Sequence, residues 1–317
     1  MRENPPDGLS ATNPRPAFYR TMLFVPGNDG RKCTRAFQAG ADAVILDLED
    51  AVAPEQKAAA RRNVCLVLET PPPLPVYVRV NSAASPHILA DLQAVVGLPV
   101  EGLMLAKAES AEEVRRVDWL LSLREEEKGL PPGGLKLIPF LESARGISRA
   151  GEVAAACRRV FCLAFGGNDY TMDIGVNYSK EGEELYYARS VLVTASAAAG
   201  IAPPLDTVNP DFRDLPALAA DARRARRLGF MGKLVIHPAQ VAPVNEVFSP
   251  TADELDWARK TVRAYAAARA AGDGVIQVDG RMVELPVVRR ARQILALAGE
   301  DAGGEQCFST SADEKRR

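Results

Sequence analysis

Residues 136–146 read Lys-Leu-Ile-Pro-Phe-Leu-Glu-Ser-Ala-Arg-Gly, and residues 160–169 read Val-Phe-Cys-Leu-Ala-Phe-Gly-Gly-Asn-Asp. Each stretch is an apolar run that ends near one carboxylate, Glu142 in the first and Asp169 in the second. Short apolar runs of this kind predict buried β-strands. If the strands are neighbours in a parallel sheet, both carboxylates emerge at one edge, where they suit a hard divalent cation such as Mg²⁺. By spacing alone, ordinary acidic loop residues remain the simpler interpretation.

Two kinds of segment alternate over most of the chain. Eight short apolar runs are predicted strands: residues 21–27, 43–50, 75–81, 101–107, 136–143, 160–167, 201–208 and 233–237. Segments with helical spacing, several closed by glycine, lie at residues 31–39, 54–69, 85–96, 111–128, 144–157, 180–199, 214–228 and 239–247. This alternation predicts a (β/α)₈ TIM barrel. A doubly wound open sheet is the alternative, but residues 25–30, Val-Pro-Gly-Asn-Asp-Gly, are not the GxGxxG turn usual there.

The predicted barrel spans residues 18–249, and three segments lie outside it. Residues 1–17 are rich in Pro, Asn and Gly, which predicts a flexible N-terminal arm. Residues 250–300 predict a C-terminal lid: a helix over 252–271, a hairpin turning at Asp279-Gly280, and a helix over 287–298. Residues 301–317 are polar and rich in Gly and Ser, which predicts a disordered tail.

Composition narrows the choice of partners. The 317 residues are 47% hydrophobic with a formal net charge of −2, which gives a full core and no basic surface for nucleic acid or anionic membranes. The five cysteines lack metal-ligand spacing, so we expect reduced thiols. No apolar run approaches the ~18 residues of a membrane span, and the start has no apolar signal segment. We expect a cytoplasmic protein that acts on a small molecule.

Polar residues gather where the predicted strands end. Nearly every such position is ionisable or carries an amide: Asp47, Glu49, Asp50, Arg79, Asn81, Lys107, Glu142, Asp169, Asp206, His237. The opposite ends of the same strands begin with apolar or loop residues. Because barrel enzymes place their reactive residues at the carboxyl ends of the strands, this asymmetry predicts a charged active site there.

Six short motifs in series resemble one family. They are Leu-Phe-Val-Pro-Gly at 23–27, Asp-Leu-Glu-Asp-Ala-Val at 47–52, Val-Arg-Val-Asn at 78–81, Leu-Glu at 141–142 with Arg-Gly at 145–146, Phe-Gly at 165–166 with Asp169, and Gly-Phe-Met-Gly-Lys-Leu-Val-Ile-His-Pro at 229–238. In this order they are similar to the citrate lyase β-subunit-like (CitE-like) group of the HpcH/HpaI aldolase and malyl-CoA lyase superfamily. The resemblance covers residues from about 20 to about 299, which is nearly the whole chain.

The resemblance implies a Mg²⁺-dependent carbon–carbon lyase. Such enzymes cleave a 3-hydroxyacyl-CoA thioester, such as malyl-CoA or citramalyl-CoA, into an acetyl-type thioester and a 2-keto acid, or run the reverse addition. It implies that Glu142 and Asp169 hold the metal, which polarises the bond that breaks. It also implies that Arg79 faces the thioester carbonyl and stabilises the charge that develops there. The amides of Gly167, Asn168 and Asp169 are expected to bind a substrate carboxylate.

Several other rim residues have two interpretations. Glu49 and Asp50 are candidate catalytic groups, or they pair with Arg79 and Lys107 as structural salt bridges. Lys107 is also a candidate substrate-binding residue, although it follows an Ala where the family usually has Pro. His237 is more simply a packing residue at a strand end than a catalyst.

Basic residues near the first two strands are further candidates. Arg20, Arg31 and Lys32 flank the end of the first predicted strand, and we expect them to contact the nucleotide part of CoA. Lys57 and Arg61 lie one turn apart on a predicted helix, which is typical of a solvated face.

The C-terminal segment departs from the family pattern at one position. In the family this segment carries an Asp that reaches over a neighbouring subunit as acid or base, and Glu284, one methylene longer, stands there in this chain. Asp279 is the other candidate, although Asp-Gly is typical of the turn itself. The apolar residues of 250–300 need a surface on which to be buried, so we expect a homotrimer whose lids close over adjacent sites.

Two other functions stay open. One is the citryl-thioester lyase β subunit of a citrate lyase complex, where a carrier protein holds the thioester; that function predicts a missing or minimal C-terminal lid. The other is a non-catalytic, ligand-sensing barrel, which loss of Glu142 or Asp169 would favour. The long lid and the complete carboxylate pair favour a stand-alone enzyme.

Overall fold

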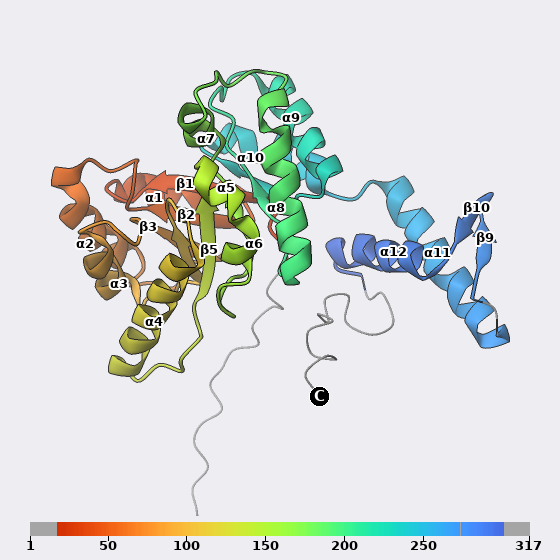
Figure 1. Cartoon of the computed structure of the whole chain (residues 1–317), viewed down its shortest axis with the longest axis horizontal. Helices are drawn as coiled ribbons and strands as arrows, with labels where there is room; N and C mark the ends of the chain where they lie inside the picture. The colour runs from red at the N-terminus through yellow and green to blue at the C-terminus, as the bar shows by residue number, and fades with distance from the viewer. Residues whose placement is uncertain (1–17, 273, 301–317) are drawn as a thin grey trace, which may run out of the picture.

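A computed structural model describes residues 18–272 and 274–300. Eight parallel strands follow one another in chain order and close into a barrel, with β8 beside β1 (Figure 1). They are β1 (Thr21–Pro26), β2 (Ala43–Asp47), β3 (Val76–Val80), β4 (Gly102–Leu105), β5 (Lys136–Leu141), β6 (Ala164–Phe165), β7 (Leu205–Asp206) and β8 (Gly232–Val235). The predicted (β/α)₈ barrel is confirmed. The flexible N-terminal segment predicted for residues 1–17 and the disordered tail predicted for residues 301–317 lie outside the described residues.

Helices connect successive strands and cover the outside of the barrel (Figure 1). They are α1 (Gly30–Ala36), α2 (Lys57–Val67), α3 (Ile88–Val95), α4 (Ala111–Glu127), α5 (Ala144–Ser148), α6 (Ala150–Ala154), α7 (Gly167–Asp173), α8 (Tyr186–Ala199), α9 (Leu215–Leu228) and α10 (Val241–Phe248), with 3₁₀ turns η1 (Pro54–Gln56), η2 (Glu183–Leu185) and η3 (Pro238–Gln240). Ser110 begins α4 by accepting the amide of Glu113, and Gly200 ends α8 in the left-handed conformation, with φ 69°.

Side chains along each strand alternate between two cores. One set fills the barrel interior: Met22, Ile45, Tyr77, Met104, Ile138, Leu205 and Leu234. The other set packs between the strands and the helices: Leu23, Val44, Val78, Leu103, Leu137 and Val235. Every second side chain of a strand points to the same side. Asp47, Arg79 and Glu142 follow the interior residues Ile45, Tyr77 and Ile138 at even spacing, so they point inward at the mouth of the barrel. The strand pattern therefore brings polar side chains from three strands to one place.

The C-terminal segment, residues 250–300, extends away from the barrel in Figure 1, and we call it the arm. It consists of α11 (Ala252–Ala271), β9 (Ile276–Val278), β10 (Arg281–Val283) and α12 (Leu285–Leu297). Thr251 and Glu254 form a capping box at the start of α11, and Asp279 and Gly280 have φ values of 47° and 77° in the hairpin turn. The buried apolar clusters described for the arm consist of arm residues only. The arm is therefore a small unit with its own packing.

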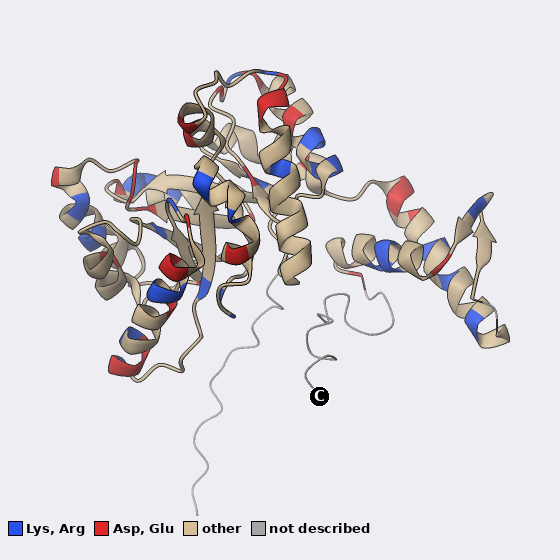
Figure 2. Ribbon diagram, viewed as in Figure 1, with Lys and Arg blue, Asp and Glu red and all other residues tan. Residues whose placement is uncertain are grey.

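Positions of Lys and Arg and positions of Asp and Glu are both spread over the helices and the arm in Figure 2. This distribution agrees with the small formal net charge of −2. Within the part of the chain that the structure describes, no helix is both long enough and apolar enough to cross a membrane.

Candidate active site

A cavity of about 200 Å³ lies at the carboxyl ends of the barrel strands. Asp47, Arg79 and Glu142 line it from the ends of β2, β3 and β5, and Asn168 and Asp169 line it from α7. The structure thus gathers residues from four separate segments into one polar pocket.

Arg79 is held in one orientation by its neighbours. Its Nε and Nη2 atoms donate to the two carboxylate oxygens of Asp47, at 2.7 and 2.5 Å, and its Nη1 lies 3.3 Å from Oε2 of Glu49. The guanidinium carbon lies 4.9 Å from the ring centre of Phe24 and 5.8 Å from that of Phe140. Burial acts to lower the pKa of Arg79, but Asp47 and Glu49 outweigh it and raise that pKa. Arg79 is therefore a permanent cation with a fixed plane.

Glu142 and Asp169 line the cavity together and are close enough to interact. Glu142 is 5% exposed, and burial, with a hydrogen bond to Asp169 added, raises its pKa well above the ordinary value although Arg79 acts in the opposite direction. Gly166 makes room for this carboxylate, because a Cβ at Gly166 would stand 2.3 Å from Cβ of Glu142. Glycine at position 166 is thus needed for Glu142 to lie beside Asp169.

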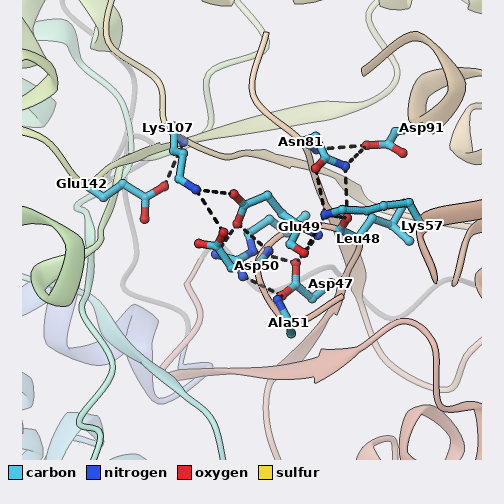
Figure 3. A network of polar contacts seen from close by, with 11 residues as sticks. Asp47, Leu48, Glu49, Asp50, Ala51, Lys57, Asn81, Asp91, Lys107 and Glu142 are labelled. Atoms are coloured by element: carbon cyan, nitrogen blue, oxygen red, sulfur yellow. Dashed lines mark hydrogen bonds and ion pairs between the residues drawn. The ribbon is translucent and has the colours of Figure 1, made fainter. Parts of the chain in front are cut away.

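Lys107 contacts carboxylates from two segments at the mouth of the barrel (Figure 3), although neither Lys107 nor Glu49 is among the residues that line the cavity. Its backbone amide donates to Oε1 of Glu142 at 2.9 Å, while its ammonium lies 2.6 Å from Oε1 of Glu49 and 3.0 Å from Oδ1 of Asp50. Burial acts to lower the pKa of Lys107, but the bonds to Glu49 and Asp50 raise it above the ordinary value. Lys107 has a positive φ of 52°, a strained conformation that persists where surrounding contacts fix it.

Glu49 and Asp50 share Lys107 but differ in their surroundings. Glu49 is 5% exposed, and burial raises its pKa despite the cations of Arg79 and Lys107. Asp50 is half-exposed, and the bonds from Glu49 and Lys107 outweigh its partial burial and lower its pKa. Because both carboxylates are engaged in ion pairs, they are placed to hold Lys107 and Arg79 in position.

The donor set of the cavity fits a hard divalent cation. Among the described residues, no group of three or more His, Cys, Asp and Glu side chains is arranged to hold a metal by itself. Mg²⁺ needs no such group, because it is commonly held by one or two carboxylates with waters and substrate oxygens. Two neighbouring carboxyl groups repel each other when both are ionised, and a divalent cation held by Glu142 and Asp169 would relieve that repulsion.

A family model described as HpcH/HpaI aldolase/citrate lyase matches residues 20–238. The chain belongs to this family. The citrate lyase β subunit of Leuconostoc mesenteroides subsp. cremoris is 37% identical over 281 residues, which are 88% of this chain and 93% of that protein. The mitochondrial citramalyl-CoA lyase of Homo sapiens is 34% identical over 291 residues, which are 88% of this chain and 85% of that protein.

Solved structures of the family agree with the fold. Protein CitE from Mycobacterium tuberculosis, in complex with magnesium, acetoacetate and coenzyme A, has a TM-score of 0.72 at 32% identity and covers 90% of this chain and 99% of its own. The predicted family is confirmed, and the predicted class, a carbon–carbon lyase, is that of the named relatives. One expectation is corrected. The 281 residues aligned with the citrate lyase β subunit exceed those of the barrel, so a long C-terminal segment does not exclude that subunit.

In this member of the family, α7 carries three residues predicted to bind a substrate carboxylate. The amide of Gly167 donates to Oγ1 of Thr207 at 2.8 Å. The prediction is corrected for Gly167, because that bond anchors the start of α7 to the loop after β7 and occupies the amide. Asn168 and Asp169 line the cavity from the first turn of the helix.

The basic residues predicted to contact a CoA nucleotide lie at two ends of the barrel. Arg20 precedes β1, and its guanidinium bonds to Asp42 and Ser249. The prediction is corrected for Arg20, because this residue stands at the amino end of the strand, opposite the cavity. Arg31 and Lys32 follow β1 at the start of α1, where they are exposed and line a shallow surface pocket at the carboxyl end.

Asp206 belongs to a buried cluster of four charges and does not reach the rim. Its carboxylate accepts from Arg189 of α8 and Lys233 of β8, and Asp221 of α9 accepts from the same two cations. The prediction that Asp206 faces the active site is wrong, because Leu205 takes the inward position of β7 and turns the next side chain outward.

Residues beside the site have roles in packing. Lys57 and Arg61 do not form the predicted solvated face: Lys57 is 7% exposed and bonds to the turn after β2, and Arg61 pairs with Asp91 of α3. The long lysine stem allows the ammonium to reach back past the start of its own helix. His237 caps η3, and its ring stacks on that of Phe212 with 4.9 Å between the ring centres, which fits a packing role.

Glu284 lies outside the cavity of its own barrel. It is the exposed N-cap residue of α12 in the arm and is not among the residues that line that cavity. Asp279 occupies the hairpin turn, 3.9 Å from the ammonium of Lys260. In this structure Glu284 therefore does not take part in the cavity of its own barrel.

Apolar and hydroxyl residues of the cavity were not predicted as site residues. Phe24, Phe140, Thr207 and Ile236 all line it. Sequence pattern alone indicates ordinary core or strand-end residues at these positions. The signal that identifies them is their spacing, because each lies two residues after a side chain that fills the barrel interior, as Phe140 lies two residues after Ile138.

Proposed function

We propose that the protein is a Mg²⁺-dependent carbon–carbon lyase that cleaves a 3-hydroxyacyl-CoA thioester, such as malyl-CoA or citramalyl-CoA, or forms it in reverse. The observation that carries the proposal is a fixed Arg79 guanidinium in the same cavity as the buried pair of Glu142 and Asp169. In cleavage, the bond between carbons 2 and 3 breaks and the hydroxyl carbon becomes the carbonyl of a 2-keto acid, losing its hydroxyl proton. The thioester fragment keeps the bonding pair as an enolate and is then protonated.

Glu142 and Asp169 are the residues that would hold Mg²⁺. When bound, the ion supplies Lewis-acid polarisation of the substrate oxygens next to the bond that breaks. Asn168 stands beside Asp169 in the first turn of α7, where we assign it to the substrate carboxylate. The relative crystallised with magnesium, acetoacetate and coenzyme A supports this choice of ligands.

Arg79 donates to the thioester oxygen in the proposed reaction. Asp47 fixes the plane of the guanidinium before substrate arrives, so little reorganisation is needed as charge develops. A preorganised donor of this kind is worth about 100- to 1,000-fold in rate. Glu49 and Asp50 keep the Lys107 ammonium beside it, and we assign Lys107 to an anionic group of the substrate.

We further propose a cytoplasmic homotrimer in which the arm of one copy completes the site of the next. Val275, Met282 and Leu285 of the arm are 57, 67 and 42% exposed, and burial of such surface on a neighbour would stabilise the assembly. Glu284 then supplies the acid or base that proton transfer to the enolate needs. The described cysteines are free thiols, which suits a reducing compartment.

A second candidate is the β subunit of a citrate lyase complex, whose thioester is carried by another protein. The 37% identity with subunits of that name favours it. The two candidates share the bond that breaks and differ in what carries the thioester.

A substrate panel tests the proposal. The purified protein is incubated with Mg²⁺ and either free 3-hydroxyacyl-CoA thioesters or a citryl thioester on its carrier protein, and the products are identified by mass spectrometry. We expect a free CoA thioester to give acyl-CoA and a 2-keto acid. Cleavage of the carrier-bound thioester alone would select the citrate lyase subunit, and no reaction in either direction with any of them would contradict a lyase.

A further inference from the structure

Lys57 is a buried cation that the proposed chemistry does not use. It is the first residue of α2, is 7% exposed and is not one of the residues that line the cavity. Its ammonium donates to the backbone oxygens of Leu48 at 2.8 Å and Glu49 at 2.7 Å, and to Oδ1 of Asn81 at 3.0 Å (Figure 3). An ammonium has three protons, and each has an acceptor here.

The two backbone oxygens belong to the turn that follows β2, which we call the Leu48–Glu49 turn. Its amides are bonded from the other direction: the carboxylate of Asp47 accepts those of Glu49 and Ala51, and the side chain of Glu49 accepts that of Asp50. Carboxylates thus bind three backbone donors of this segment, and the ammonium binds two of its backbone acceptors. Two backbone bonds also hold this turn: the amide of Leu48 donates to the oxygen of Arg79 at 2.9 Å, and the amide of Val52 donates to the oxygen of Glu49 at 3.0 Å. Most of its other bonds come from side chains.

Asn81, which follows β3, and Asp91 of α3 support the same turn. Nδ2 of Asn81 donates to the oxygen of Leu48 at 3.0 Å and to Oδ2 of Asp91 at 2.6 Å. Asp91 is fully buried and pairs with Arg61. Within this network the Lys57 ammonium bonds to both successive carbonyl groups of the turn and to Asn81, while Asn81 itself bonds to the carbonyl of Leu48.

The turn carries the two carboxylates that position the cations of the site. Glu49 lies 3.3 Å from Nη1 of Arg79 and 2.6 Å from Nζ of Lys107, and Asp50 lies 3.0 Å from the same ammonium. Among the described residues, the hydrogen bonds of the Lys57 ammonium go to the backbone of this turn and to Asn81, so its contacts reach the cavity through the turn. Its charge also attracts the carboxylates of Glu49, Asp47 and Asp50.

We infer that Lys57 is a positioning residue of the active site, which locks the Leu48–Glu49 turn and so sets Glu49 and Asp50 against Lys107 and Arg79. Its effect on turnover rests on the proposed function, whereas its effect on the turn does not. A compact ammonium suits the position, because three acceptors from two segments converge on one nitrogen.

One variant with a matched control tests the inference. Lys57→Met removes the charge and the donors but keeps most of the length, and Arg62→Met removes an exposed cation from the same helix. Hydrogen exchange of residues 47–52, the melting temperature and kcat are measured for each. In Lys57→Met we expect about tenfold faster exchange confined to 47–52. We also expect kcat to fall about 100-fold, since a misplacement near 1 Å costs on this order. Arg62→Met should match the wild type.

Chemical rescue separates positioning from a general loss of stability. Propylammonium added to Lys57→Ala should restore slow exchange at 47–52 and recover turnover, because it returns the cation to the cavity left by truncation. If the neutral variants do not fold, Lys57→Arg keeps the charge with a planar fork, and we expect faster exchange and lower kcat from it too.

Two results would overturn the inference. The first is wild-type exchange at 47–52 in a folded Lys57 variant, and the second is a kcat unchanged within error while only the melting temperature falls. A wild-type protein without lyase activity would count against the proposed function alone, and the exchange of 47–52 would still decide the role of Lys57.

Discussion

Among single residues, Arg79 offers the clearest test of the site geometry. Arg79→Lys keeps the charge but loses the fork that bonds both oxygens of Asp47. We expect kcat/KM to fall about 100- to 1,000-fold, because the donor at the developing oxyanion is lost or displaced. Steady-state kinetics with a melting curve as the check on folding measure this. Activity within a few-fold of wild type would show that Arg79 is structural.

Gly166 offers a test of the carboxylate pair without touching a carboxylate. In Gly166→Ala the new Cβ would stand 2.3 Å from Cβ of Glu142, so we expect weaker Mg²⁺ binding by calorimetry and at least about 100-fold lower activity. Gly151 in α6 is the control, because a Cβ there meets nothing within 4 Å. Gly151→Ala should keep full activity and gain about 0.5–1 kcal/mol of stability. Similar metal affinity in the two variants would contradict the packing argument.

At the level of elements, four buried charges join α8 and α9 to β7 and β8. Burial acts to raise the pKa of Asp221, but Lys233 and Arg189 outweigh it and lower that pKa well below its ordinary value. A depressed folded pKa gives stability that is complete above the unfolded pKa of about 3.9 and is lost as the pH falls below it. We expect the free energy of unfolding to fall progressively as the pH drops below about 4, and to fall less in Asp221→Asn. Urea unfolding measures both, and equal slopes would contradict this role of the cluster.

The same elements show what the sequence could predict. Strand and helix periodicity is local, so the barrel and the carboxyl-end position of Arg79 and Glu142 followed from short apolar runs. Two features were not in that pattern. The outward direction of Asp206 depends on the inward place of its neighbour in a strand of two residues. The bond from Lys57 to Asn81 spans 24 positions of sequence, and spacing along one helix does not contain it.

For the whole molecule, the arm decides whether one chain makes a complete site. Glu284→Ala and Glu142→Ala should each be nearly inactive alone, because one lacks the proposed acid or base and the other the metal ligand. After subunit exchange, mixed assemblies would contain sites with both residues intact, so we expect activity to return to a fraction of the wild-type level. No recovery despite demonstrated exchange, or a monomer in sedimentation at working concentration, would show that Glu284 does not act on a neighbour.

The most direct test of the lyase itself follows both products at once. A ¹³C-labelled CoA thioester is observed by NMR with the wild-type protein and Mg²⁺, with EDTA in place of Mg²⁺, and with Glu142→Ala and Asp169→Ala. We expect acyl-CoA and 2-keto acid to appear in equal amounts with wild type and Mg²⁺, and the rate to fall at least about 100-fold in the other three samples. Cleavage that continues at the wild-type rate with EDTA and in both variants would contradict a metal-dependent lyase at this site.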